Sequence, residues 1–344
     1  MVQTNIKYIG RFAPTPSGKL HFGSLVTALG SYLRAKSLKG FWHLRIEDID
    51  EPRCNNENTL SIINTLEDFA FEWDGEILYQ SQRKDRYKEV LEILNKHNLT
   101  YSCSCTRSDI KNMGGIYNNR CRDLNIPPSN SNAIRFKNDN NISSFKDSLL
   151  GYIDIHNIAF AENNDFILKR RDGYYSYNLS CVVDDIDTNI TEIVRGNDIL
   201  ATTFAQLNLR NAIITCSNET NCNNQNYQHN SNNLNFIHLP LVLCSDTQKY
   251  SKQNHATPID SKLAKAYLCV ALLFLEQKII DEIDTIFKKI FGNDKLVKLN
   301  TVTKTELEQL ERSIPYSCEQ ILDHAIKNFN FLSIPTNNKI LTIN

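Results

Sequence analysis

The first fifty residues alternate between β-prone and helical patterns, and this order restricts the fold more than any other feature. Residues 6–12 form a short β-prone run, which ends at a loop because Pro14 and Pro16 lack the N–H that a strand ladder needs. From Gly23 apolar residues recur at helical spacing until Gly40, and residues 41–46 form a second β-prone run. The order predicts a β-α-β unit, and therefore an α/β fold that binds ligands where its parallel strands end.

The rest of the chain suggests how this fold is extended. Helical patterns follow near residues 59–70 and 84–98, and the parallel sheet is expected to resume at 182–187 and 190–194. After Asp260 the pattern is helical to near the end. We predict four regions: 1–100 and 186–245 as the two halves of a Rossmann-type domain, 101–185 as an insertion with short strands, and 246–344 as a mainly helical region. Residues 217–235, rich in asparagine, are expected to form a surface loop.

Composition excludes several classes of protein. The formal net charge of -1 does not suit a dedicated DNA-binding protein, although an enzyme that handles RNA needs only a local basic face. The longest apolar stretch, residues 266–275, is about half the length of a membrane span, and the polar N-terminus has no signal core. We therefore expect a cytoplasmic, monomeric protein that does not bind membranes.

The loop before the first helix carries the first chemical motif. Residues 11–24 read RFAPTPSGKLHFGS. A loop that leads into a helix N-terminus offers free N–H groups and the positive end of the helix dipole, which suits phosphates. His21 can donate to a phosphate oxygen, and Gly23 allows a ligand to approach the backbone. On these residues alone, a proline-rich turn with an ordinary helix cap explains the motif equally well.

A short basic segment is the second motif. Residues 249–253 read KYSKQ and follow the apolar run 239–243. Lys249 and Lys252 on a tight loop can stabilise the charge that develops on a transferring phosphoryl group. Considered alone, such a segment is more often solvated surface.

Three cysteines near residue 110 suggest a metal site. Cys103 and Cys105 have Cys-x-Cys spacing, and Cys121 follows a Gly-Gly turn, so three thiolates are available for a tetrahedral ion. No histidine lies nearby to complete the set. The alternative is three reduced cysteines without metal.

Taken together, the two motifs resemble the HIGH and KMSKS signatures of the class I aminoacyl-tRNA synthetases. Further phrases resemble the glutamate-specific branch of that family: RIEDIDEPR from Arg45, YQSQR from Tyr79, VRGNDIL from Val194 and HLPLVL from His238. The likeness runs in order from about Tyr8 to Pro258. Within the branch, the chain is most similar to the shortened glutamyl-queuosine tRNA(Asp) synthetases, because about 90 residues follow the lysine segment and leave little room for an anticodon-binding domain.

The resemblance implies roles for particular residues. The glutamate site would comprise Arg11, Phe12, Ala13, Pro14, Thr15, Glu47, Tyr177 and Arg195. The ATP site would comprise His21, Gly23, Ser24, Lys249, Ser251 and Lys252, with His21 and Lys252 catalytic and Mg²⁺ accompanying ATP. A structural ion pair is the alternative for Arg11 and Glu47. The pair Asp184 and Asp185 is expected at a strand end, without a ligand role.

The resemblance also implies a fourth metal ligand. It places Tyr117 beside Cys103, Cys105 and Cys121 around one structural zinc ion. Two departures from the family pattern bear on these assignments. Asn118 and Asn119 replace a Pro-Gly pair before the last cysteine, and residues 201–204 lack the family's usual Pro-Arg-Gln, which bears on any nucleic-acid contact of that region.

The implied reaction forms glutamyl-adenylate from glutamate and ATP, then transfers glutamate to the queuosine base in the anticodon loop of tRNA(Asp). Three alternatives stay open from the sequence. They are charging of a tRNA 3′ end, adenylyl or nucleotidyl transfer without tRNA, and an inactive RNA- or zinc-binding protein.

Overall fold

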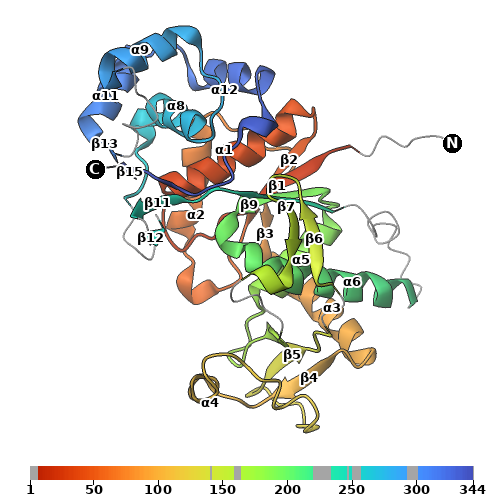
Figure 1. The fold of residues 1–344 in the computed structure, drawn as a ribbon. Coiled ribbons are helices and arrows are strands. Elements are labelled where there is room, and N and C mark those ends of the chain that lie inside the picture. Colours follow the sequence, from red (N-terminus) through yellow and green to blue (C-terminus); the bar gives the residue numbers. More distant parts are fainter. Residues whose placement is uncertain are drawn as a thin grey trace, which may run out of the picture.

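A computed structural model gives the fold (Figure 1) and describes residues 7–139, 142–158, 164–219, 234–245, 248–249, 257–292 and 301–343. The helices are α1 (Phe22–Ser37), α2 (Asn56–Asp68), α3 (Lys84–Lys96), α4 (Arg107–Asn112), α5 (Tyr177–Asp187), α6 (Thr203–Glu219), α8 (Ala264–Phe274), α9 (Asp281–Phe291), α11 (Lys304–Ser313) and α12 (Cys318–Lys327).

The strands of the described segments form five small sheets. They are β1 (Ile9–Phe12), β2 (Phe41–Ile46), β3 (Leu78–Tyr79), β4 (Thr100–Cys103), β5 (Ala133–Phe136), β6 (Ser144–Asp147), β7 (Gly151–Asp154), β8 (Ile167–Lys169), β9 (Glu192–Gly196), β10 (Asn235–Leu239), β11 (Val242–Ser245), β12 (Gln248–Lys249), β13 (Thr301–Val302), β14 (Lys339–Ile340) and β15 (Thr342–Ile343).

The predicted β-α-β unit is confirmed. β1 pairs in parallel with β2, and β2 pairs in parallel with β3. A second parallel group joins β9, β10 and β6. The two groups meet where the backbone N–H of Thr191 donates to the carbonyl of Ile9 at 2.9 Å. The carboxyl ends of β1, β2, β9 and β10 therefore provide the edge at which an α/β fold binds its ligands.

Helix α1 links this parallel structure to the C-terminal helices. In Figure 1 it lies between β1 and the group formed by α8, α9, α11 and α12. Its buried residues, among them Leu25, Leu29 and Leu33, belong to the same apolar cluster as Leu268 of α8 and Leu322 of α12. This packing fixes the start of α1 beside the ends of the strands.

The structure corrects three expectations. Residues 182–187 belong to α5 and not to a strand. The hydroxyl of Ser176 caps this helix by accepting from the N–H of Leu179, and the unbroken buried run 179–186 is what a short sequence window can mistake for a buried strand. The C-terminal region contains strands β13, β14 and β15 in addition to helices. The ends of the expected asparagine-rich loop lie in α6 and β10, while residues 220–233 lie outside the described residues. The division into four regions stays a prediction.

Candidate active site

A pocket lies between the start of α1 and the ends of β9 and β10. Three residues of the first motif, His21, Gly23 and Ser24, line one side together with Thr27 of α1. Opposite them are Gly196, Asp198, Pro240, Leu241 and Val242. The structure therefore brings together the three residues of this motif that were predicted to bind ATP.

His21 caps helix α1. Its Nδ1 accepts from the backbone N–H of Ser24 at 3.2 Å, and its Nε2 lies 3.2 Å from the Ser24 hydroxyl. An accepting Nδ1 places the proton of the neutral ring on Nε2. His21 can therefore donate a hydrogen bond from Nε2, as its predicted role requires.

The lysine segment can be followed only at its edges. Ser251 and Lys252 lie outside the described residues, and Lys249 is described as the last residue of β12. β12 pairs with β11, which begins at the pocket residue Val242. On the far side, Pro258 forms an antiparallel bridge with His21, and the N–H of Ile259 donates to Leu20 at 3.0 Å. The described residues on either side of residues 250–256 thus lie beside the pocket.

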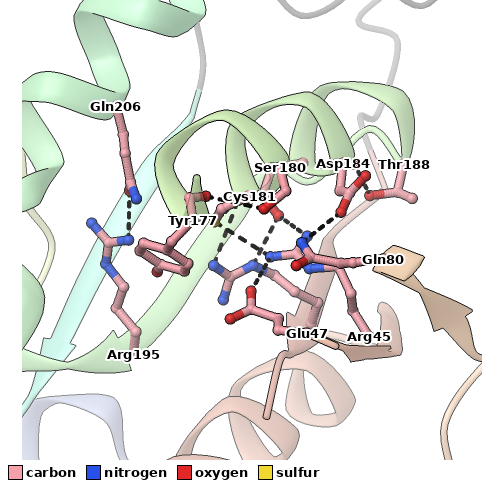
Figure 2. Close-up of polar contacts among 12 residues, drawn as sticks. Arg45, Glu47, Gln80, Tyr177, Ser180, Cys181, Asp184, Thr188, Arg195 and Gln206 are labelled. Carbon is pink, nitrogen blue, oxygen red and sulfur yellow. Dashed lines mark hydrogen bonds and ion pairs between the residues drawn. The ribbon is translucent and has the colours of Figure 1, made fainter. Parts of the chain in front are cut away.

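A buried charge cluster lies where β1 and β2 end. Arg11 donates from Nε to Asp185 at 3.1 Å, and Arg45 donates from Nη1 to the same carboxylate oxygen at 2.6 Å. Arg45 also lies 3.2 Å from Glu47. Figure 2 shows Glu47 beside Arg45, below helix α5. Among the described residues, no ion pair joins Arg11 to Glu47: Arg11 pairs with Asp185, and Glu47 pairs with Arg45.

The electrostatics of this cluster follow from burial and charge. Burial alone would raise the pKa of Asp185, but the attraction of Arg11 and Arg45 outweighs it and lowers that pKa below its ordinary range. For Glu47, burial dominates and raises the pKa against the opposing effect of Arg45. The cluster thus keeps Asp185 ionised. A positive group bound beside Glu47 would favour the ionised form of Glu47 and lower its pKa.

Arg195, the last of the predicted arginines, has a different environment. It is 4% exposed, and its guanidinium donates to three neutral acceptors: His238 Nε2 at 3.1 Å, Gln206 Oε1 at 2.7 Å and Thr203 Oγ1 at 2.7 Å. Within the described part of the chain, no carboxylate forms an ion pair with it. Figure 2 shows the Tyr177 ring between Arg195 and Glu47.

The other residues that were predicted to bind glutamate lie near the same region. Phe12 stacks on Trp42 with ring centres 6.2 Å apart, so its side chain belongs to the core. The carbonyl of Pro14 accepts from the N–H of Glu47 at 3.0 Å, which fixes the loop carrying Ala13 and Thr15 against the end of β2. Burial raises the pKa of Tyr177, so its phenol stays protonated.

Several residues of this site were missed by sequence reasoning. Arg45 and His238 lie inside phrases that carried the resemblance, but no role was assigned to them. Asp184 and Asp185 were noticed only as a pair. Asp184 accepts hydrogen bonds from Gln80, Arg83 and Tyr87, so both carboxylates serve partners within the chain. Only long-range packing identifies these partners.

The cysteine cluster has the geometry of a metal site. The sulfur atoms of Cys103, Cys105 and Cys121 lie within 4.8 Å of one another, and those of Cys105 and Cys121 are 3.4 Å apart. The Tyr117 hydroxyl lies 3.7 Å from the Cys103 sulfur. Tetrahedral zinc with Zn–S bonds of about 2.3 Å requires sulfur atoms roughly 3.8 Å apart. The four side chains therefore fit one tetrahedral ion.

Tyr117 is also prepared to act as an acceptor. Its oxygen accepts from the N–H of Cys121 at 2.9 Å, and the guanidinium of Arg135 lies 3.6 Å from its ring centre. Burial raises the pKa of Tyr117, which opposes ionisation, whereas a metal ion favours the phenolate.

We predict that Asp185→Asn destabilises the protein by about 3 kcal/mol at pH 7, because it leaves two buried guanidinium groups without their carboxylate. The folded pKa of Asp185 lies below the unfolded value of about 3.9, so its contribution is complete above that pH and declines as the pH falls through the folded pKa. Urea unfolding of the wild type and of Asp185→Asn from pH 8 to pH 3 measures the difference between their unfolding free energies. This difference should become smaller only below about pH 4.

The exposed pair of Asp172 with Arg170 provides the control. Asp172→Asn should change the unfolding free energy by less than about 1 kcal/mol. An Asp185→Asn protein as stable as this control at pH 7 would contradict the importance assigned to the buried cluster.

Comparisons with known proteins agree with this geometry. Residues 7–267 match the family model of the class I tRNA synthetases (E and Q), catalytic domain. A Glutamyl-Q tRNA(Asp) synthetase of Photorhabdus laumondii is 44% identical over 80% of this chain and 81% of its own, and one of Shewanella amazonensis is 39% identical over 97% of both. A glutamate-tRNA synthetase structure from Elizabethkingia anophelis has a TM-score of 0.67 at 20% identity, covering 98% of this chain and 68% of that one, which shows the shared fold.

No helix in the part of the chain that the structure describes is both long and apolar enough to cross a membrane.

The matched family model and the two relatives lead to one conclusion: the chain belongs to the class I tRNA synthetases of the glutamate and glutamine type, and within them to the Glutamyl-Q tRNA(Asp) synthetase family.

Proposed function

We propose that this protein activates glutamate as glutamyl-adenylate with ATP and transfers it to the queuosine base in the anticodon loop of tRNA(Asp). The α-carboxylate of glutamate attacks the α-phosphate of ATP, which forms a mixed anhydride and displaces pyrophosphate. A nucleophilic group of the acceptor then attacks the glutamyl carbonyl carbon, which forms the new acyl bond and displaces AMP. The protein needs no side-chain nucleophile, because binding and charge stabilisation supply the catalysis.

The observation that carries this proposal is the environment of Arg195. Arg11 and Arg45 pair directly with the buried carboxylates Asp185 and Glu47. Among the described residues, Arg195 donates to three neutral acceptors and forms no direct ion pair, because the nearby carboxylate of Asp147 bonds to His238 instead. Glutamate has a net charge of about -1, and one of its two carboxylates can pair with the guanidinium of Arg195.

Each charged part of glutamate then has a partner of opposite sign. Arg195 binds one carboxylate, and Arg11 uses the N–H groups that Asp185 and Val194 leave available. Glu47 binds the α-ammonium group, and Tyr177 and the backbone of residues 12–15 close the site. ATP, with its Mg²⁺, occupies the pocket of His21, Gly23 and Ser24. Lys249, Ser251 and Lys252 complete the contacts to its phosphates.

We also propose that one zinc ion is held by Cys103, Cys105, Tyr117 and Cys121. The sulfur spacing and the phenol oxygen that faces them support this. A closed set of four ligands leaves no open position, so the ion would stabilise the fold of the surrounding loop.

We predict that Lys252→Ala lowers the rate of glutamate-dependent ATP–pyrophosphate exchange by at least about 100-fold, while the KM for glutamate changes less than about twofold. The reason is that Lys252 meets charge that appears only as the phosphoryl group transfers. Lys262→Ala, at an exposed lysine shortly after the segment, is the matched control. More than about a third of wild-type activity in Lys252→Ala would remove this residue from the mechanism.

Metal content tests the zinc proposal. Purified protein should contain one zinc per chain, and Cys105→Ser should lose the metal and unfold at a lower temperature, because three ligands hold zinc less tightly. Cys318→Ser, at a cysteine outside the cluster, should keep both the metal and the melting temperature. An active wild-type protein without metal would overturn this assignment.

The acceptor is tested with labelled glutamate. We expect the label on tRNA(Asp) that carries queuosine and not on the same tRNA without that base, because unstacked anticodon bases expose edges for recognition. The alternative enzyme, a synthetase that charges the 3′ end, would label unmodified tRNA(Glu), and periodate treatment of that tRNA would abolish the labelling.

A further inference from the structure

The charge of Arg195 is kept apart from a buried carboxylate by one imidazole ring. His238 accepts from Arg195 through Nε2 at 3.1 Å, while its Nδ1 lies 2.7 Å from Asp147. His238 and Asp147 are both fully buried. Because Nε2 accepts from a guanidinium, the proton of the ring must be on Nδ1, where it points to Asp147. The two hydrogen bonds that link Asp147, His238 and Arg195 therefore have fixed donors and acceptors: Arg195 donates to His238, and His238 donates to Asp147.

Asp147 is itself held by the backbone. Its Oδ1 accepts from the N–H groups of Leu149 and Leu150, both at 2.8 Å. Its Oδ2 accepts from the backbone N–H of His238 at 3.1 Å as well as from the ring. Thr203 adds a second constraint, since its hydroxyl accepts from Arg195 and lies 3.2 Å from His238 Nε2. With these bonds in place, Arg195 has little rotational freedom.

The two other arginines of the site show why the ring matters. Asp185 pairs directly with Arg11 and Arg45, and their charges are compensated within the protein. A carboxylate placed directly on Arg195 would compensate its charge in the same way and compete with an anionic ligand. A neutral imidazole accepts the hydrogen bond and leaves the charge uncompensated. Burial lowers the pKa of His238 to about 4, so the ring is neutral near pH 7.

We propose that Asp147, His238 and Thr203 are positioning residues for glutamate binding: they fix the orientation of Arg195 while leaving its positive charge available to a substrate carboxylate. This inference rests on the proposed function, because it requires Arg195 to bind glutamate. It assigns a role to the histidine of the HLPL phrase, to strand β6 and to the start of α6.

The KM for glutamate in ATP–pyrophosphate exchange is the main measurement. His238→Phe keeps an aromatic ring that can stack on Phe236, whose ring plane lies within 5° of the histidine, but it removes the acceptor. We expect its glutamate KM to rise about tenfold or more, which corresponds to the loss of one buried hydrogen bond to a charged group. The KM for ATP should change less than about twofold. His238→Gln, which keeps a neutral acceptor, should restore part of the loss.

His43→Phe is the matched control. His43 also lies on a parallel strand and stacks on a phenylalanine, Phe41, but its ring bonds to the Asp74 carbonyl and not to an arginine of the site. Neither KM should change in this variant. If the role of His238 were only structural, His238→Phe would lower the stability of the protein but would not change the glutamate KM more than the ATP KM. His238→Gln would then not restore the glutamate KM.

Two further variants make the outcome decisive. Thr203→Val replaces the hydroxyl by a methyl group of similar size and decides the matter if His238→Phe does not fold: an unchanged glutamate KM overturns the inference. Arg195→Ala separates the two proposals. If it raises the glutamate KM strongly but His238→Phe does not, the positioning role is wrong and the proposed function stands. If wild-type protein shows no glutamate-dependent exchange, the proposed function itself fails.

Discussion

The carboxylate of Asp185 is the interaction on which the site depends. It joins Arg11 of β1 and Arg45 of β2 to helix α5, although about 140 to 175 residues separate these partners along the chain. Two arginines cannot remain buried side by side without such a carboxylate, because their mutual repulsion adds to the loss of hydration. The pairing therefore sets how α5 lies across the ends of the first two strands. Tyr177, at the start of α5, reaches the site only because the helix is fixed in this position.

The spacing of apolar residues along the chain was enough to predict the first strands and helices. The strand at 41–46 was predicted with the bounds that β2 has, and the helices after Gly23 and near Lys84 were found within a few residues. These elements alternate apolar and polar residues at their own period and end at glycine or capping residues. The first motif was also interpretable from sequence, since proline and glycine fix the loop, and His21 caps the helix that follows.

The residues that sequence could not assign are those whose roles come from tertiary contacts. The run from Val182 to Asp187 resembles a buried strand, because residues 179–186 are buried one after another and Val182, Val183 and Ile186 are β-branched. Arg195 and Arg11 have the same chemistry in the sequence, yet one meets three neutral acceptors and the other a carboxylate. That difference arises from Asp185 and His238, which approach from other elements. Spacing along the chain contains no information about such pairs.

The departures of this chain from the family pattern are compatible with the local geometry. Asn119 stands where the family has glycine, and its backbone adopts the left-handed conformation with φ of 61°, which asparagine tolerates better than most residues. Its side chain then accepts from the N–H of Asp165 at 3.0 Å, and the Asp165 carboxylate accepts from Tyr101 at 2.8 Å. Tyr101 in turn lies 3.3 Å from the Tyr117 hydroxyl. Asparagine thus preserves the turn before Cys121 and adds a polar connection from the cysteine cluster to the segment leading into β8, which glycine has no side chain to make.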